Sequence, residues 1–110
     1  MYTKQQIAKG FMAYMLQELA NNGCQDIRKW MIPFAGEPFV MRMLDQYSDV
    51  MKSMNLMTEN GEIDVDSVYN RLVKISESSG PISQEIPVMG KMKFGTEDVM
   101  RIYNCIREVP

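Results

Sequence analysis

Histidine is absent from the 110 residues of this chain, and cysteine occurs only twice. Without an imidazole, the sequence lacks the most common general base, the usual zinc ligand and every Ser-His or Cys-His nucleophile pair. A Gly-rich phosphate loop, the G-x-S-x-G turn of hydrolases and the dinucleotide-binding fingerprint are missing as well. We therefore expect no catalytic residue, no cofactor and no metal ligand, and we interpret the chain as a non-enzyme.

Long hydrophobic runs are also missing, and this absence bears on where the protein resides. No stretch approaches the ~20 apolar residues that span a bilayer. The apolar run over 11–16 is too short for the core of a secretory signal, and Glu18 interrupts the apolar residues after it. Cys24 and Cys105 lack the paired spacing of a zinc or redox site, which favours free, buried thiols. We expect a cytoplasmic protein that does not contact membranes.

Positive charge is not in excess, because 12 Lys and Arg residues stand against 14 Asp and Glu residues, for a net charge of −2. This balance provides no global field that attracts nucleic acid or an anionic surface. Apolar residues make up 45% and charged residues 24%, which is the ordinary composition of a globular chain. Because no linker or compositional break divides the sequence, we expect a single domain over residues 1–110.

Four segments have the apolar spacing of amphipathic helices. Thr3 and Gln6 form a capping-box pattern before the first segment, and Pro38 suits the first position of the second. Asp64 and Thr96 are typical N-cap residues before the third and the fourth. We therefore expect main helices over residues 3–22, 38–57, 64–75 and 96–109.

A β-hairpin is predicted in the C-terminal half. Apolar residues alternate over 82–88, a turn at Met89-Gly90 comes next, and Met92 and Phe94 continue the alternation. Pro87 confines its strand to an edge or a bulge, and we expect Glu62-Ile63 to join the hairpin as a short strand. The predicted fold class is α+β and predominantly helical, with about four main helices and a small sheet built around this hairpin.

Methionine is unusually frequent in the sequence, with 12 residues. Several lie on the broad apolar stripe of the helix predicted over 38–57, where flexible thioether side chains can fill a core. Phe39, Met41 and Leu56 fall beside or outside that stripe, so we expect them near the surface as a candidate interface. The leading hypothesis is a non-catalytic protein-interaction module that self-associates or docks a protein partner through this Met-rich helix.

An alternative hypothesis is a small nucleic-acid-binding regulator. Arg28 and Lys29 stand beside Trp30, a combination that can grip a phosphate and stack a base. Lys91 and Lys93 lie in the predicted hairpin, which would be the wing of a winged-helix-like arrangement. The net negative charge disfavours this alternative.

A second alternative is a divalent-metal-dependent enzyme that uses the acidic run over 59–66. The run is similar to the second half of an EF-hand loop, with Gly61 at the position of the glycine turn. Leu56, Thr58 and Ser67 then occupy three ligand positions, so a turn followed by a helix cap accounts for the same residues without a metal.

Overall fold

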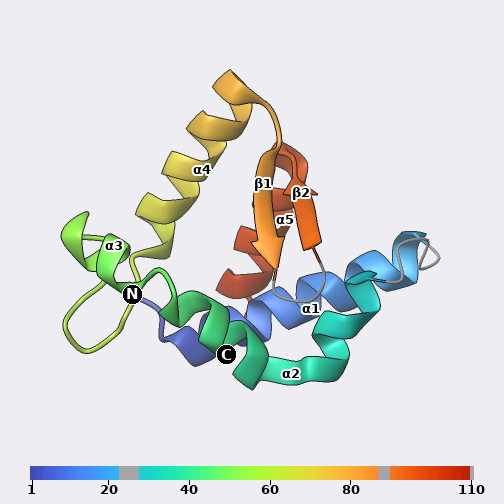
Figure 1. The fold of residues 1–110 in the computed structure, drawn as a ribbon, viewed down its shortest axis with the longest axis horizontal. Coiled ribbons are helices and arrows are strands. Elements are labelled where there is room, and N and C mark those ends of the chain that lie inside the picture. The colour runs from blue at the N-terminus through green and yellow to red at the C-terminus, as the bar shows by residue number, and fades with distance from the viewer. Residues whose placement is uncertain (23–27, 87–89, 110) are drawn as a thin grey trace.

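The computed structural model describes residues 1–22, 28–86 and 90–109, and the side chains of 1–21, 36–85 and 91–109. Within these residues the fold is predominantly helical with a small two-stranded hairpin in its C-terminal half, which confirms the predicted α+β class (Figure 1). None of the described helices combines the length and the apolar character needed to cross a bilayer. The elements are α1 (Lys4–Asn22), α2 (Arg28–Asp45), α3 (Ser48–Ser53), α4 (Val65–Ser79), β1 (Ile82–Ile86), β2 (Gly90–Phe94) and α5 (Thr96–Arg107).

Helix starts follow the capping residues of the sequence closely. The Thr3 amide donates to the Gln6 side chain at 2.9 Å and the Gln6 amide donates to the Thr3 hydroxyl at 3.1 Å, which is the predicted capping box. The Asp64 carboxylate accepts from the Ser67 amide at 3.2 Å and caps α4 as predicted. The cap of α5 is Gly95 and not Thr96, because the Asp98 side chain accepts from the Gly95 amide.

The helix predicted over 38–57 is right at its start and wrong at its end. The residues of α2 form two helices that meet at a kink at Gly36, so the second of them begins after Gly36, close to Pro38, but it ends at Asp45. Gly36 has φ 78° and ψ −176°, a conformation that only glycine adopts readily. After Asp45 the amide of Tyr47 bonds to a carbonyl three residues back instead of four, so the helix tightens and stops before α3.

Helix α3 ends at a left-handed residue, Asn55, with φ 59°. The Asn55 amide donates to the Lys52 carbonyl at 3.1 Å, and the Leu56 amide donates to the Met51 carbonyl at 2.8 Å. These two bonds form a Schellman motif, which turns the chain out of the helix and brings the residue after the turn back against it. Leu56 is accordingly buried, with only 7% of its surface exposed.

The hairpin pairs β1 with β2 in antiparallel register, with Ile82 opposite Phe94 and Gln84 opposite Met92. Pro87 and the predicted turn at Met89 lie outside the described residues. The expectation that Glu62-Ile63 joins the hairpin is wrong, because Ile63 forms antiparallel bridges to Tyr2 and Met57 instead. This bridge ties the start of the chain to the segment before α4.

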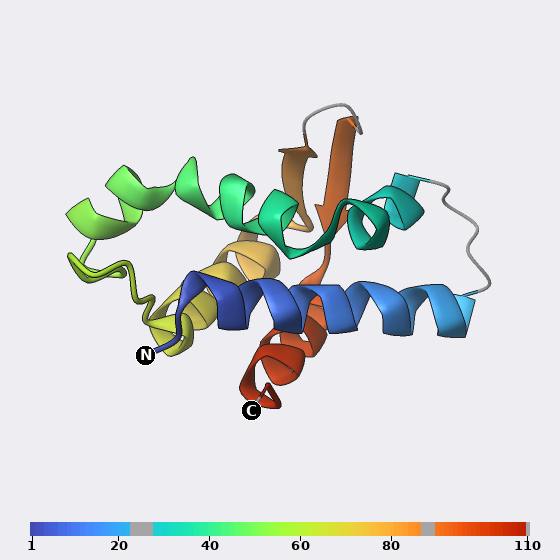
Figure 2. The ribbon, with the colours of Figure 1, turned by 90° about the horizontal axis from the view of Figure 1, so that it is seen from below.

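Helix α1 packs against α2 on one side and α5 on the other, and α5 in turn packs against α4 (Figure 2). The helices α1 and α5 approach closely at Gly10, where an added Cβ would lie 2.4 Å from the Cα atom of Ile106. A side chain at this position would push the two helices apart, so the crossing depends on glycine. Two groups of buried residues form the core: Ala8, Tyr14, Met15, Val40, Met92 and Cys105, and Ile7, Met57, Ile63, Val65 and Ile106.

Candidate functional site

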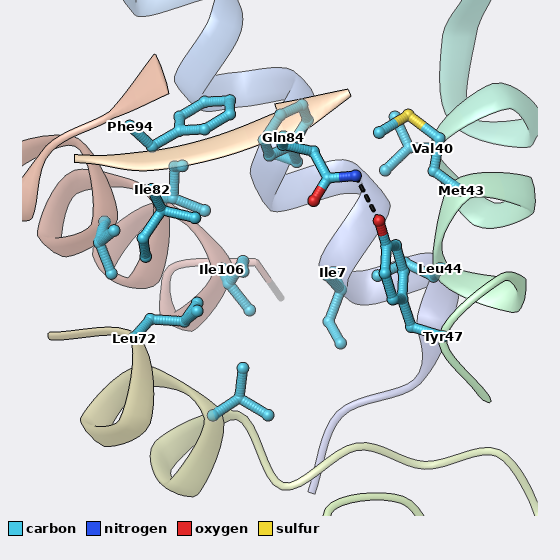
Figure 3. A pocket seen from close by; sticks show the side chains of 14 residues that line it. Ile7, Val40, Met43, Leu44, Tyr47, Leu72, Ile82, Gln84, Phe94 and Ile106 are labelled. Carbon is cyan, nitrogen blue, oxygen red and sulfur yellow. Dashed lines mark hydrogen bonds between the residues drawn. The ribbon is translucent and has the colours of Figure 1, made fainter. Parts of the chain in front are cut away.

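A pocket of about 290 Å³ opens between the helices and the hairpin (Figure 3). Side chains from α1, α2, α4, α5 and both strands reach its walls, so elements distant in the sequence meet there. We call this site the apolar pocket. Its lining residues are Ile7, Phe11, Val40, Met43, Leu44, Tyr47, Val68, Leu72, Ile82, Gln84, Phe94, Val99, Ile102 and Ile106.

Helix and strand periodicity explains why these walls are apolar. Val99, Ile102 and Ile106 follow one another at three- and four-residue spacing, which places them on one face of α5. Ile82 and Phe94 are cross-strand partners, so their side chains leave the hairpin on the same face. Each element thus turns its apolar face towards a common space that the side chains do not fill.

Only two lining residues carry polar side-chain groups, and they bond to each other. The Gln84 amide nitrogen donates to the Tyr47 hydroxyl and also to the backbone carbonyl of Glu85, at 3.1 Å in the latter case. Tyr47 lies between α2 and α3 and is 40% exposed, so this pair stands at the edge of the pocket. In Figure 3 the amide nitrogen of Gln84 points towards the hydroxyl of Tyr47.

The pocket contains no charged side chain among its fourteen lining residues. A charged group moved from water into such an environment loses its hydration without gaining a partner. An apolar group leaves water favourably and gains contacts with the walls. The site therefore discriminates against charge and accepts apolar surface.

A polar network outside the pocket fixes α1 against α5. Tyr14, which is 2% exposed, donates through its hydroxyl to Asp98 at 3.0 Å, and Arg101 pairs with Asp98 at 2.7 Å and with the buried Glu18 at 3.0 Å. Burial of Asp98 opposes its ionisation, but hydrogen bonds from the Gly95 amide, Tyr14 and Arg101 outweigh burial and hold its pKa below the ordinary value. Burial raises the pKa of Tyr14, so its hydroxyl stays a donor.

The three predicted interface residues do not form one exposed face. Phe39 and Met41 are half-buried and pack against the core around Val40. The expected exposure of Leu56 is wrong, because the turn at Asn55 folds this side chain inward. An interface at Phe39 and Met41 stays a prediction.

The predicted nucleic-acid contacts are only partly described. Arg28, Lys29 and Trp30 form the first turn of α2, but their side chains lie outside the described ones. Lys91 and Lys93 are exposed on the outer face of β2, opposite Glu85 and Ser83. The structure does not bring the two groups into one described patch, and the winged-helix-like alternative stays a prediction.

In the acidic run over 59–66, which is described in full, the carboxylates do not gather into a group that could hold a metal ion, and the metal-dependent alternative stays a prediction. Asp64 is committed to capping α4, and hydrogen bonds from the Ser67 hydroxyl and amide lower its pKa. The Asp66 carboxylate accepts a hydrogen bond from Tyr103. Among the described residues, no group of three or more carboxylates and thiols could hold a metal ion. Cys105 is a free, buried thiol, and Cys24 is not among these residues.

The sequence contains one local signal for this site. Gln84 occupies the inward face of the alternating strand, between Ile82 and Ile86, where an apolar residue is expected. A polar residue on an apolar face indicates a specific partner, and the partner proves to be Tyr47. The pocket itself carries no such local signal.

No family model, curated protein or solved structure matches this chain. Its function must therefore be inferred from the geometry of the apolar pocket. That geometry consists of an uncharged lining, a volume of about 290 Å³ and one polar pair at the edge.

Proposed function

We propose that this protein is a non-catalytic binding module that buries an apolar group of its binding partner in the apolar pocket. The observation that carries the proposal is the lining: fourteen side chains from six helix and strand elements and one turn, without a charge among them. Binding energy then comes from removing apolar surface from water, at roughly 25 cal/mol per Å².

The dimensions and the chemistry of the pocket both support binding rather than catalysis. Its volume of about 290 Å³ lies near the lower end of small-molecule sites, which run from roughly 300 to 1,000 Å³. Apart from the Tyr47 hydroxyl, no lining side chain could act as a nucleophile, an acid or a base. A site of this kind holds a group without transforming it.

A neutral fluorescent probe tests this proposal directly. N-phenyl-1-naphthylamine brightens on entering an apolar site, and we expect saturable binding at one site per chain. Val68→Phe adds a ring to the wall contributed by α4 and should abolish binding. Ile75→Phe makes the same kind of addition on the exposed side of the same helix and should leave it intact.

Two controls keep this test decisive. Circular dichroism and thermal unfolding must show that both variants fold, because overpacking can destabilise a core. Non-saturable brightening, or equal binding by wild type and Val68→Phe, would remove the pocket as the binding site.

Self-association is a second candidate function, because three large apolar side chains stay exposed around α3. Tyr47, Val50 and Met54 are 40%, 55% and 40% exposed, at helical spacing. We propose a second copy of this chain as the occupant, so that like faces pair about a two-fold axis. Solution mass measured across a concentration series should rise to a dimer, and Val50→Glu should return it to the monomer. A monomer at every concentration of the wild type would end this candidate.

A further inference from the structure

We infer that the ligand of the apolar pocket is a small, uncharged molecule with an apolar body and one hydrogen-bonding group, which docks on the Tyr47–Gln84 pair. This inference rests on the proposed function and adds the chemical class of the ligand. Three observations carry it: the position of the pair, the absence of charge among the lining residues, and the limited volume of the pocket.

The Tyr47–Gln84 pair is placed to form hydrogen bonds with a single polar group of a ligand in the pocket. Gln84 comes from the inward face of β1 and Tyr47 from the turn between α2 and α3, yet their side chains meet at the edge of the pocket (Figure 3). Their mutual bond uses one amide hydrogen of Gln84 and one lone pair of Tyr47. The hydroxyl proton of Tyr47 and the amide oxygen of Gln84 remain chemically able to bond a ligand.

This capacity matches a hydroxyl group particularly well. A ligand hydroxyl can accept from the Tyr47 proton while donating to the Gln84 amide oxygen. An ionised carboxylate can only accept, and it would face an apolar wall with no cation among the lining residues. The pocket should therefore favour an alcohol or a phenol over the matching acid.

The limited volume of the pocket, about 290 Å³, favours a small molecule over a partner helix. A docked amphipathic helix needs an open groove that follows the length of its apolar face. Here the walls come from both ends of the described chain, from Ile7 on α1 to Ile106 on α5, and the hairpin adds a further wall. The pocket is partly open to solvent, and its volume suits one compact group and not the length of a helix.

A matched series of competitors tests the inference, with N-phenyl-1-naphthylamine as the displaced probe. The series consists of 4-propylphenol, propylbenzene and 4-propylbenzoate at pH 8, which share a body and differ in the end group. We expect 4-propylphenol to displace the probe roughly 2- to 10-fold more strongly than propylbenzene, the range of one net hydrogen bond. The benzoate should be the weakest competitor.

Variants of the pair identify the source of that preference. Tyr47→Phe keeps the ring and removes the hydroxyl, and Gln84→Leu keeps the shape and removes the amide. In the double variant the phenol should lose its advantage, whereas displacement by propylbenzene should stay unchanged. Tyr47→Phe alone, at an exposed position, gives a folded protein for the same comparison if the double variant unfolds.

The outcomes separate this inference from the proposed function. Probe binding with equal displacement by all three competitors, or with the benzoate strongest, would overturn the inference and leave the pocket as an apolar site. A phenol preference that persists in the double variant, or that stays at full size in Tyr47→Phe, would overturn it as well. Failure of the probe to bind at all would overturn both.

Discussion

The hydroxyl of Tyr14 on α1 donates a 3.0 Å hydrogen bond to the carboxylate of Asp98, which lies 84 residues later on α5. Both helices supply walls of the apolar pocket, through Ile7 on α1 and Val99 beside Asp98 on α5. The bond lies outside the pocket, but it fixes the position of α1 relative to α5 and therefore the distance between these two walls. The geometry of the site thus depends on a polar contact that no ligand would touch.

Removing that hydroxyl should destabilise the fold without changing its shape. Tyr14→Phe keeps the buried ring and leaves Asp98 with one donor fewer, which should cost about 1.5 to 3 kcal/mol because the acceptor is charged. Urea unfolding measures this difference. Tyr69→Phe, in a ring stacked on Tyr103, is the matched control and should change stability by less than about 0.5 kcal/mol. Equal effects of the two changes would contradict the assignment.

Asp98 should make stability depend on acidic pH. Burial opposes its ionisation, but hydrogen bonds from Gly95, Tyr14 and Arg101 lower its pKa in the folded state relative to about 3.9 in the unfolded chain. A lowered carboxyl pKa contributes stability that is present above about pH 4 and is lost as pH falls through the folded value. Unfolding free energy measured from pH 7 to pH 2 should therefore fall in this window.

The variant Asp98→Asn isolates this contribution. It should be less stable than wild type at pH 7 and should lose less stability on acidification. Part of the acid loss should remain, because the Ser67 hydroxyl and amide also lower the pKa of Asp64. Parallel pH profiles for the wild type and the variant would show that Asp98 does not contribute.

Gly10 should not tolerate alanine, although alanine favours helices. The new methyl group would meet the backbone of Ile106 at 2.4 Å, so α1 and α5 would have to separate. Overpacking should cost about 1 to 3 kcal/mol, while the gain in helix propensity is at most ~1 kcal/mol, so we expect Gly10→Ala to be destabilising on balance. Gln5→Ala, at an exposed position of the same helix, is the control for propensity. A stabilised Gly10→Ala in thermal unfolding would argue against the close crossing.

Asn55 terminates α3 in a left-handed conformation that glycine adopts without strain. Asn55→Gly should be neutral or stabilising, and Asn55→Val should cost about 1 to 2 kcal/mol. Thermal unfolding of the two variants checks this order. The reverse order would mean that the Schellman turn does not hold Leu56 in place.

Sequence patterns correctly predicted the helix caps, which depend on residues only three or four positions apart. The capping box at Thr3 and Gln6 and the cap at Asp64 were correct, because these bonds join near neighbours in the chain. The alternation around Ile82 and Phe94 also predicted the hairpin, because a period of two within each strand marks its inward face. Such patterns need no knowledge of the rest of the fold.

The break between α2 and α3 was not predictable from local signals of that kind. No glycine or proline lies between Pro38 and Asn55, and the apolar spacing runs on through Tyr47 and Met51. The predicted helix therefore continued towards Asn60-Gly61 and passed over Asn55, whose left-handed conformation ends α3. Leu56 was assigned to a helix surface that does not exist.

Predicting the apolar pocket requires information that sequence periodicity does not contain. Sequence periodicity shows which face of each helix is apolar, but not whether the faces fill the space between them. That depends on the crossing of α1 and α5 at Gly10, on the Tyr14–Asp98 bond and on the position of Tyr47 after the end of α2. The expected exposure of Leu56 was wrong because it was judged from one helix in isolation.

The lining of the apolar pocket begins with Ile7 and ends with Ile106. During synthesis, a nascent chain has no such site until α5 has left the ribosome and packed against α1. The proposed ligand would then stabilise only the finished fold, in proportion to RT ln(1 + [L]/Kd), and would not bind intermediates that lack α5. In a cell that holds the ligand, completed molecules would be protected from proteolysis while unfinished ones would remain susceptible.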